Sequence, residues 1–233
     1  MSKNAVFFDF GGTLLVMRRD RIIRLILSAA GYKASPEDVH SSYFKAEPAW
    51  LLAYGNRTMT PEEAEESYRT LDAMVFTSLF PDHSEEEARR MSALMRSRWP
   101  DVQKSIPLEL YPDARPALER LRRDGYVTAL VSNAPADMTK TIDALGLTEL
   151  VKTVVVSGVV GVSKPNPEIF RIALHSAGVA ADETVHVGDL YDADVLGARN
   201  AGIEGVLIDR EGSYGDLDCP KIASLEEVYR FLE

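Results

Sequence analysis

Short apolar runs alternate with segments of helical periodicity over much of this chain. The runs cover residues 5–9, 127–132, 153–157, 183–189 and 206–208. Short apolar runs of this kind, separated by helical segments, are typical of the buried strands of a parallel sheet. The pattern therefore predicts an α/β fold with a doubly wound parallel-sheet core.

Helical segments lie between or after these runs. They cover residues 112–123, 137–145, 167–178 and 192–201, and one more follows Ser224. Pro167 stands at a favoured first position of its helix, and Gly202 closes the helix that ends at Ala201. A strand-helix alternation therefore continues to the end of the sequence.

The stretch between residues 16 and 104 shows helical spacing and no strand alternation. One helix is expected over residues 18–31. Three more begin where an N-cap residue precedes proline or acidic residues. These N-cap residues are Ser35, Thr60 and Ser84. We therefore expect an α/β core of residues 1–15 and 105–233, with an inserted helical domain of residues 16–104.

Composition narrows the classes of function that this fold can serve. The chain has 233 residues, of which 45% are hydrophobic and 27% charged, as in ordinary globular proteins. A net charge of −10 disfavours nucleic acid or an anionic membrane as a partner but is compatible with small phosphates. A single cysteine, Cys219, and the lack of a visible secretory signal or membrane-length apolar run make the cytoplasm the expected location. A monomer and a homodimer both stay open.

Polar residues suited to phosphate chemistry follow four of the apolar runs. Asp9 ends the first run, and Ser132 with Asn133, Lys164 and Asp189 follow later ones. Taken alone, Asp9 and the Ser132-Asn133 pair are better explained as ordinary turn or loop residues, and a loop lysine is usually just solvated. In a parallel α/β sheet, however, ligands bind outside the carboxyl ends of the strands, so these residues are expected to converge on one crevice.

The carboxylates among these residues are suited to a metal ion. Asp189 and Asp194, facing Asp9, would form an oxygen-ligand site for a hard cation, and Mg²⁺ fits such a site. Asp192 is expected to cap the following helix or to face solvent. His186 lies inside an apolar strand and is expected to be a core histidine rather than a ligand.

Four ordered motifs coincide with these strand ends. They are Asp9-Phe10-Gly11-Gly12-Thr13, Ser132-Asn133, Lys164-Pro165, and Gly188-Asp189 followed by Asp194. This set resembles the four motifs of the haloacid dehalogenase (HAD) superfamily, and the inserted helices resemble its C1-type cap. The resemblance covers essentially the whole chain and implies a hydrolase with a Rossmann-like core and a helical cap.

The resemblance also implies a role for each catalytic residue. Asp9 would attack phosphorus and form an aspartyl-phosphate. Thr13 would order the first loop, and Ser132 would hydrogen-bond the transferring phosphoryl group. Lys164 would stabilise the charge of that group and hold Asp9 ionised.

Binding residues follow from the same resemblance. The phosphate-binding residues would be Phe10, Gly11, Gly12, Ser132, Asn133 and Lys164. The Mg²⁺ ligands would be Asp9, Asp189, the backbone carbonyl of Gly11, and Asp194 as ligand or support. The expected substrate is a small phosphorylated metabolite, with candidate contacts at Arg18, Arg19 and residues 54–57.

Gly11 departs from the family pattern. Family phosphatases usually carry a second aspartate there, which protonates the leaving oxygen and later activates water. General acid–base catalysis is typically worth about 10²–10⁴-fold. The metal site thus looks complete without its acid–base partner, which indicates a good leaving group, a proton supplied by the substrate, or a slow reaction.

Other functions stay open on the sequence alone. A 2-haloacid dehalogenase would use Asp9 to attack carbon and also lacks the second aspartate, but it needs no metal and usually has a bulky aromatic residue in place of Gly11. A non-catalytic phosphate-binding protein would explain Gly11, although it gives no reason to retain Asp9, Lys164 and Asp189 together. A phosphonate-cleaving enzyme would use a cap lysine, for which Lys45 is the candidate.

Overall fold

The computed structural model describes residues 3–54, 60–210, 212 and 214–232. Contacts within the chain divide it into two compact units. The first unit comprises Met1–Val16 and Glu109–Glu233, and the second comprises Met17–Leu108. The roles of these units as catalytic core and cap stay predictions.

The first unit also includes a short segment beside the first loop, residues 109–111. Val16 donates its N–H to the Glu109 carbonyl at 2.8 Å, and Tyr111 donates to the Leu14 carbonyl at 2.8 Å. Residues 109–111 therefore pair with the chain that leaves the first loop, and the unit resumes at Glu109 rather than at residue 105.

A sheet of six parallel strands forms the centre of the described part of the first unit, in the order β3-β2-β1-β4-β5-β6. The strands are β1 Ala5–Phe8, β2 Val127–Ser132, β3 Thr153–Val156, β4 Thr184–Gly188, β5 Glu204–Ile208 and β6 Lys221–Ile222. Phe8 of β1 lies opposite Leu130 on one side and Val187 on the other. The strand order changes direction at β1, so the carboxyl end of β1 is where such sheets bind ligands. The predicted doubly wound parallel sheet is confirmed.

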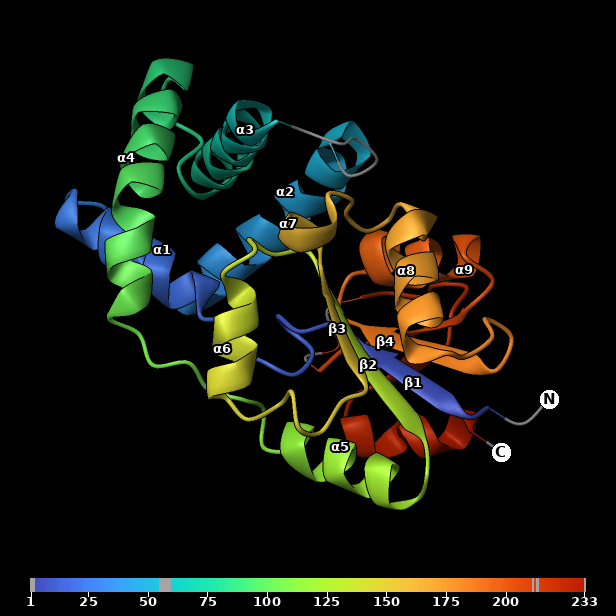
Figure 1. Cartoon of the computed structure of the whole chain (residues 1–233). Coiled ribbons are helices and arrows are strands. Elements are labelled where there is room, and N and C mark those ends of the chain that lie inside the picture. Colours follow the sequence, from blue (N-terminus) through green and yellow to red (C-terminus); the bar gives the residue numbers. More distant parts are fainter. Residues whose placement is uncertain (1–2, 55–59, 211, 213, 233) are drawn as a thin grey trace. The chain divides into compact units, whose positions relative to one another are not determined.

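Helices lie on both faces of this sheet (Figure 1). They are α5 Ala114–Arg123, α6 Met138–Ala144, α7 Ser157–Val160, α8 Pro167–Ala177 and α9 Gly197–Asn200. Ile169 and Phe170 of α8 are fully buried in one hydrophobic cluster with Phe7 of β1 and Val131 of β2. Helix α5 lies on the opposite side of the strands (Figure 1). Because both faces are covered, the strands are mostly apolar, as their sequences indicated.

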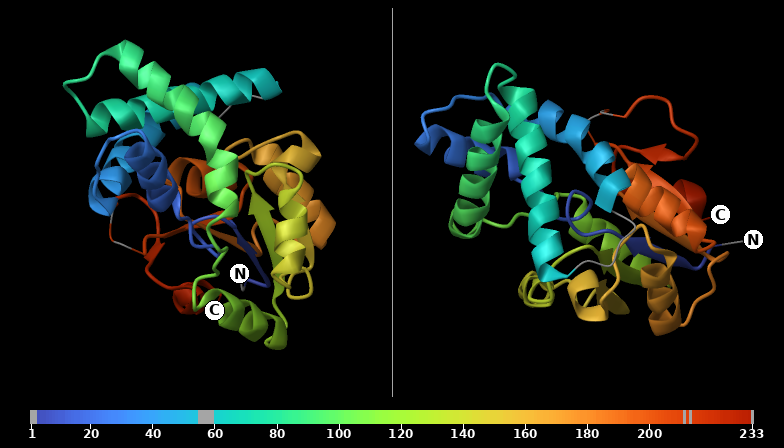
Figure 2. Two further views of the ribbon diagram at one scale, coloured as in Figure 1. Left: turned by 90° about the vertical axis from the view of Figure 1, so that its left-hand side faces the viewer. Right: turned by 90° about the horizontal axis from the view of Figure 1, so that it is seen from above.

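The described part of the second unit contains four helices, as predicted. They are α1 Arg19–Ala29, α2 Pro36–Tyr54, α3 Pro61–Leu79 and α4 Glu85–Lys104, and Figure 2 shows them from two further directions. Thr60 and Ser84 form the expected capping boxes with Glu63 and Glu87. The buried apolar side chains of the second unit form a hydrophobic core of their own, which includes Phe76. None of the described helices has the length and apolar character needed to cross a membrane.

Three local features differ from the predicted elements. The segment predicted as a helix over residues 192–201 begins as a π-helical turn, η1 Tyr191–Leu196, before α9. A 3-10 helix, η2 Leu225–Phe231, replaces the last predicted α-helix. Strand β6 and helix α7 were not predicted, because elements of two and four residues are too short to show periodicity. Wide π-helical turns often occur at functional sites, and η1 carries Asp194.

Candidate active site

Asp9 follows β1 directly at the carboxyl edge of the sheet. Its N–H donates to the Val187 carbonyl of β4 at 2.9 Å, so its backbone is held by the neighbouring strand. The residue is 6% exposed. Ser132 ends β2, the strand on the other side of β1, and is also buried. The sheet thus supplies rigid backbone for both residues.

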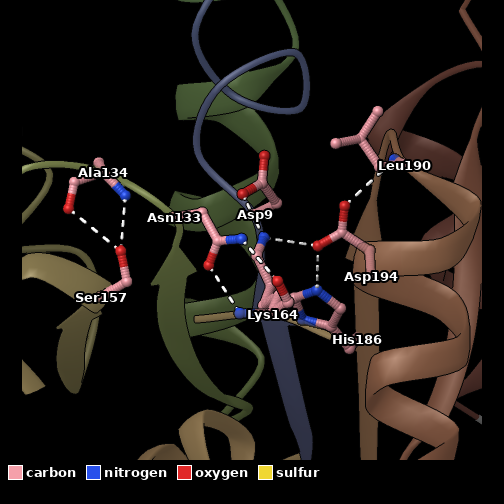
Figure 3. Close-up of polar contacts among 8 residues, drawn as sticks. All are labelled: Asp9, Asn133, Ala134, Ser157, Lys164, His186, Leu190 and Asp194. Carbon is pink, nitrogen blue, oxygen red and sulfur yellow. Dashed lines mark hydrogen bonds and ion pairs between the residues drawn. The ribbon is translucent and has the colours of Figure 1, made fainter. Parts of the chain in front are cut away.

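Lys164 lies between two of the predicted site carboxylates. Its Nζ donates to Asp9 Oδ1 at 2.5 Å and to Asp194 Oδ1 at 2.6 Å, as Figure 3 shows. All three side chains are buried. The fold therefore brings together residues from the end of β1, the loop before α8 and the turn after β4, which lie far apart in the sequence.

Burial and charge act against each other on these three groups. Burial raises the pKa of Asp9, and the neighbouring Lys164 opposes this only in part. Burial also raises the pKa of Asp194, but Lys164 and a hydrogen bond from His186 outweigh it and lower the pKa to about 2. Burial lowers the pKa of Lys164, yet the two carboxylates prevail and raise it. At neutral pH Lys164 is therefore an ammonium ion and Asp194 a carboxylate.

The carboxylates could hold a divalent cation. Asp9, Asp189 and Asp194 each offer an oxygen, and these oxygens lie within 4.8 Å of one another. Oxygen-only donor sets of this size suit Mg²⁺. Asp194 also accepts three hydrogen bonds, from Lys164 and His186 at Oδ1 and from the Leu190 N–H at Oδ2. Asp194 therefore has less capacity left for a metal than its position suggests.

Gly12 gives the Asp189 carboxylate the room that it occupies. The φ angle of Gly12 is 88°, and a Cβ atom at this position would lie 2.0 Å from Asp189 Oδ2. Gly188 plays a similar part, since its Cβ atom would lie 2.1 Å from Asp194 Cγ. Contacts this close force a shift of the carboxylate, so both glycines shape the cation site.

We expect Gly12→Ala to displace Asp189 and to weaken Mg²⁺ binding at least roughly ten-fold, the scale of changes that disturb metal ligands. Gly125→Ala is the matched control, because Gly125 has a φ angle of 89° and nothing within 4 Å of its Cβ position. Both variants carry the same backbone strain, of roughly 1–2 kcal/mol. Calorimetric Mg²⁺ titration of both proteins measures the difference, and equal affinities would show that Gly12 does not shape the site.

Several predicted phosphate-binding groups already have partners within the protein. The Asn133 side chain accepts from the Lys164 N–H at 2.7 Å and donates to the Lys164 carbonyl at 2.8 Å (Figure 3). Gly12 donates its N–H to the Leu15 carbonyl at 2.8 Å, and the Phe10 side chain is buried in the core. Asn133 therefore holds the loop around Lys164 in place, and the Gly12 N–H closes the turn between Gly12 and Leu15.

A second ion pair supports the first loop and was missed by the sequence analysis. Arg210 forms a two-pronged pair with Asp113, with both distances 3.0 Å, and donates to the Thr13 carbonyl at 2.9 Å. The Arg210 guanidinium also lies 3.8 Å from the centroid of the Tyr111 ring. Thr13 is fully buried, and its hydroxyl has no partner among the described residues. Arg210 closely follows β5, so its position after the apolar run of residues 206–208 is a sequence signal that indicates it.

His186 was predicted to be a core histidine, and it is fully buried in β4. Its Nε2 lies 2.9 Å from Asp194 Oδ1, so it also belongs to the polar cluster (Figure 3). Burial lowers its pKa, which outweighs the opposing effect of Asp194. An alternation of inward and outward residues along a strand cannot reveal such a contact, because both faces of this sheet are buried.

Predicted substrate contacts outside the motifs belong to the second unit. Arg19 lies 3.9 Å from a Glu47 oxygen and 4.8 Å from the centroid of the Tyr43 ring. Lys45 is exposed on α2. Of the loop predicted over residues 54–57, all but Tyr54 lie outside the described residues.

Known proteins are similar to this chain in sequence or in fold. The phosphoserine phosphatase of Thermus thermophilus is 42% identical over 124 residues, which are 52% of this chain and 50% of that protein. The glyceraldehyde 3-phosphate phosphatase of Methanopyrus kandleri is 35% identical over 165 residues, 66% of this chain and 70% of that protein. The HAD-hydrolase YfnB of Bacillus subtilis, solved bound to magnesium, covers 100% of both chains with a TM-score of 0.73 at 20% identity, which shows a shared fold.

The match at the family level covers most of the chain. A family model for haloacid dehalogenase-like hydrolases matches residues 3–202. These residues include all four motifs and the four strands β1 to β4 of the parallel sheet. The chain therefore belongs to the haloacid dehalogenase-like hydrolase family.

Proposed function

We propose that this protein is a Mg²⁺-dependent phosphatase of small phosphorylated metabolites that works through an aspartyl-phosphate on Asp9. The observation that carries the proposal is the position of Lys164, whose ammonium group contacts Asp9 at 2.5 Å and Asp194 at 2.6 Å. A buried cation at this place favours the ionised form of Asp9 and offers positive charge to a phosphoryl group beside it. Relatives named as phosphatases support the reaction class.

The chemistry at Asp9 has two steps. An Asp9 carboxylate oxygen forms a bond to phosphorus while the bond from phosphorus to the leaving oxygen breaks; the leaving oxygen departs with the bonding electrons as a stable anion or takes its proton from the substrate or solvent. Water then attacks the phosphorus of the aspartyl-phosphate, and the bond to Asp9 breaks. Inorganic phosphate is released and the carboxylate is restored. Lys164 stays protonated throughout, because its pKa is raised by Asp194 and Asp9 against the effect of burial.

The cation site fits this role on the evidence of its donors. Asp9 and Asp189 would hold Mg²⁺ together with the Gly11 carbonyl, while Asp194, which already accepts three hydrogen bonds, would support the site. Bound Mg²⁺ would neutralise negative charge on the phosphoryl oxygens. A positive charge beside Asp9 would also favour its ionised form, because burial raises the pKa of Asp9 above the ordinary value.

We expect Mg²⁺-dependent phosphate release from a panel that contains O-phosphoserine, glyceraldehyde 3-phosphate and p-nitrophenyl phosphate. The reason is that burial raises the pKa of Asp9 and Lys164 alone does not fully reverse this effect. EDTA should abolish the release, and added Mg²⁺ should restore it. Release that is indifferent to EDTA, or no release from any phosphate ester, would overturn the proposal.

A second assay on the same protein distinguishes phosphatase activity from 2-haloacid dehalogenase activity. We expect no halide release from 2-chloropropionate in EDTA, because Asp189 and Asp194 beside Asp9 suit a cation that this metal-free reaction does not need. Ion chromatography of the reaction mixture measures chloride directly. Chloride release that persists without metal and disappears in Asp9→Asn would favour the dehalogenase.

A further inference from the structure

His186 contacts the polar cluster of Asp9, Lys164 and Asp194 from strand β4. It lies in the middle of β4 and is fully buried. Its Nε2 is 2.9 Å from Asp194 Oδ1, and its ring meets the Phe170 ring edge to face at 4.9 Å between centroids. Its Nδ1 has no hydrogen-bond partner among the described residues. Within the part of the chain that the structure describes, the imidazole therefore has its one hydrogen-bond contact with Asp194.

The contact defines which nitrogen carries the proton. An ionised carboxylate only accepts hydrogen bonds, so Nε2 must carry a proton and donate to Asp194. A proton on Nδ1 would be buried without an acceptor, which costs about 1–3 kcal/mol. The neutral tautomer with a proton on Nε2 satisfies both conditions, so His186 acts as a donor.

Three donors surround the Asp194 carboxylate from different directions. His186 and Lys164 share Oδ1, and the Leu190 N–H reaches Oδ2 at 3.1 Å. The Lys164 contact continues to Asp9 at 2.5 Å. Without the His186 donor, Asp194 Oδ1 keeps only its contact with Lys164, and the Leu190 N–H alone holds Oδ2, so the carboxylate and the Lys164 ammonium group are less firmly placed.

We propose that His186 is a positioning residue whose Nε2–H fixes Asp194 and, through Asp194, keeps the Lys164 ammonium group against Asp9. Its effect on phosphate release rests on the proposed function. Its effect on the geometry does not, since the chain of contacts from His186 to Asp9 is present whatever the substrate. The two can therefore be tested separately.

The first test concerns the tautomer and needs no substrate. We expect the ¹⁵N spectrum of histidine-labelled protein to show His186 with a protonated Nε2 and an unprotonated Nδ1, assigned by its loss in His186→Gln. The Nε2 proton should be shifted downfield by the carboxylate and should move upfield in Asp194→Asn. An Nδ1–H tautomer, or a proton indifferent to Asp194→Asn, would overturn the proposal.

The second test compares two side chains of similar shape at one position. Glutamine places a donor nitrogen as many bonds from Cβ as His186 Nε2, and methionine places a methyl group there. We expect His186→Met to lower kcat roughly ten-fold or more with a smaller change in KM, the scale seen when groups behind metal or charged ligands are removed. His186→Gln should retain most of the wild-type kcat. Equal kcat values for the two variants would overturn the positioning role.

A binding measurement on variants with wild-type thermal unfolding keeps the outcome clear if the protein hydrolyses none of the tested esters. Inorganic phosphate with Mg²⁺ is the probe, and calorimetry gives its affinity for wild type, His186→Gln and His186→Met. We expect weaker phosphate binding in the methionine variant alone, because Lys164 is no longer held in place. Wild-type phosphate binding without turnover would contradict the proposed function and leave the positioning test intact. Equal affinity in all three proteins would overturn the positioning role.

Discussion

Asp9→Asn is expected to reduce phosphate release by about 10⁴–10⁶-fold, the range observed when one member of a nucleophilic unit is removed. The amide cannot form the covalent bond to phosphorus, so the two-step path is closed. The fold should persist, because the asparagine carbonyl can still accept from the Lys164 Nζ that lies 2.5 Å from Asp9 Oδ1. Burial already disfavours the charged form of Asp9, which further limits the effect on stability.

Phosphate release and thermal unfolding of the variant measure these two effects. Asp192→Asn is the matched control, since Asp192 lies in η1 but outside the cluster of Asp9, Asp189 and Asp194. Wild-type protein quenched during turnover should also carry a phosphoryl group that hydroxylamine removes, and the variant should not. More than a tenth of wild-type activity in Asp9→Asn, with the fold unchanged, would exclude Asp9 as the nucleophile.

Gly11→Asp is expected to raise the rate on alkyl phosphates by roughly 10²-fold, at the low end of the gain from general acid–base catalysis. Lys164 is a poor proton donor, because the pKa shift from its two carboxylate neighbours is upward. The backbone at Gly11 suits a side chain, since the left-handed φ angle of this loop is at Gly12 instead. A carboxyl group at position 11 would supply the proton that an alkoxide leaving group needs.

The gain should depend on the leaving group. We expect a large increase with O-phosphoserine and a smaller one with p-nitrophenyl phosphate, because nitrophenolate leaves readily without a proton. Gly11→Asn is the control of equal shape that cannot transfer a proton, and it should show no increase. An unchanged or lower rate in a folded Gly11→Asp protein would mean that Gly11 is a fitted part of the site.

Local sequence features were sufficient to predict most secondary structure. The capping boxes at Thr60 and Ser84 involve residues three positions apart, so the start of each helix is visible in the sequence. The runs that became β1 and β4 are apolar because both faces of each strand are buried. The π-helical turn that carries Asp194 was predicted as ordinary helix, because a pattern over six residues does not separate the two forms.

The sequence by itself determined the parallel sheet and the residues at the ends of its strands, because each depends on short-range patterns of apolar residues. Only the tertiary structure decided how those residues share their hydrogen bonds. Asn133 binds the Lys164 backbone, and Asp194 divides its oxygens among Lys164, His186 and Leu190. The pairings with Lys164 join residues 30 or 31 positions apart in the chain, and those of Asp194 with His186 and Leu190 depend on how the strand end and the turn fold, so no sequence spacing records them.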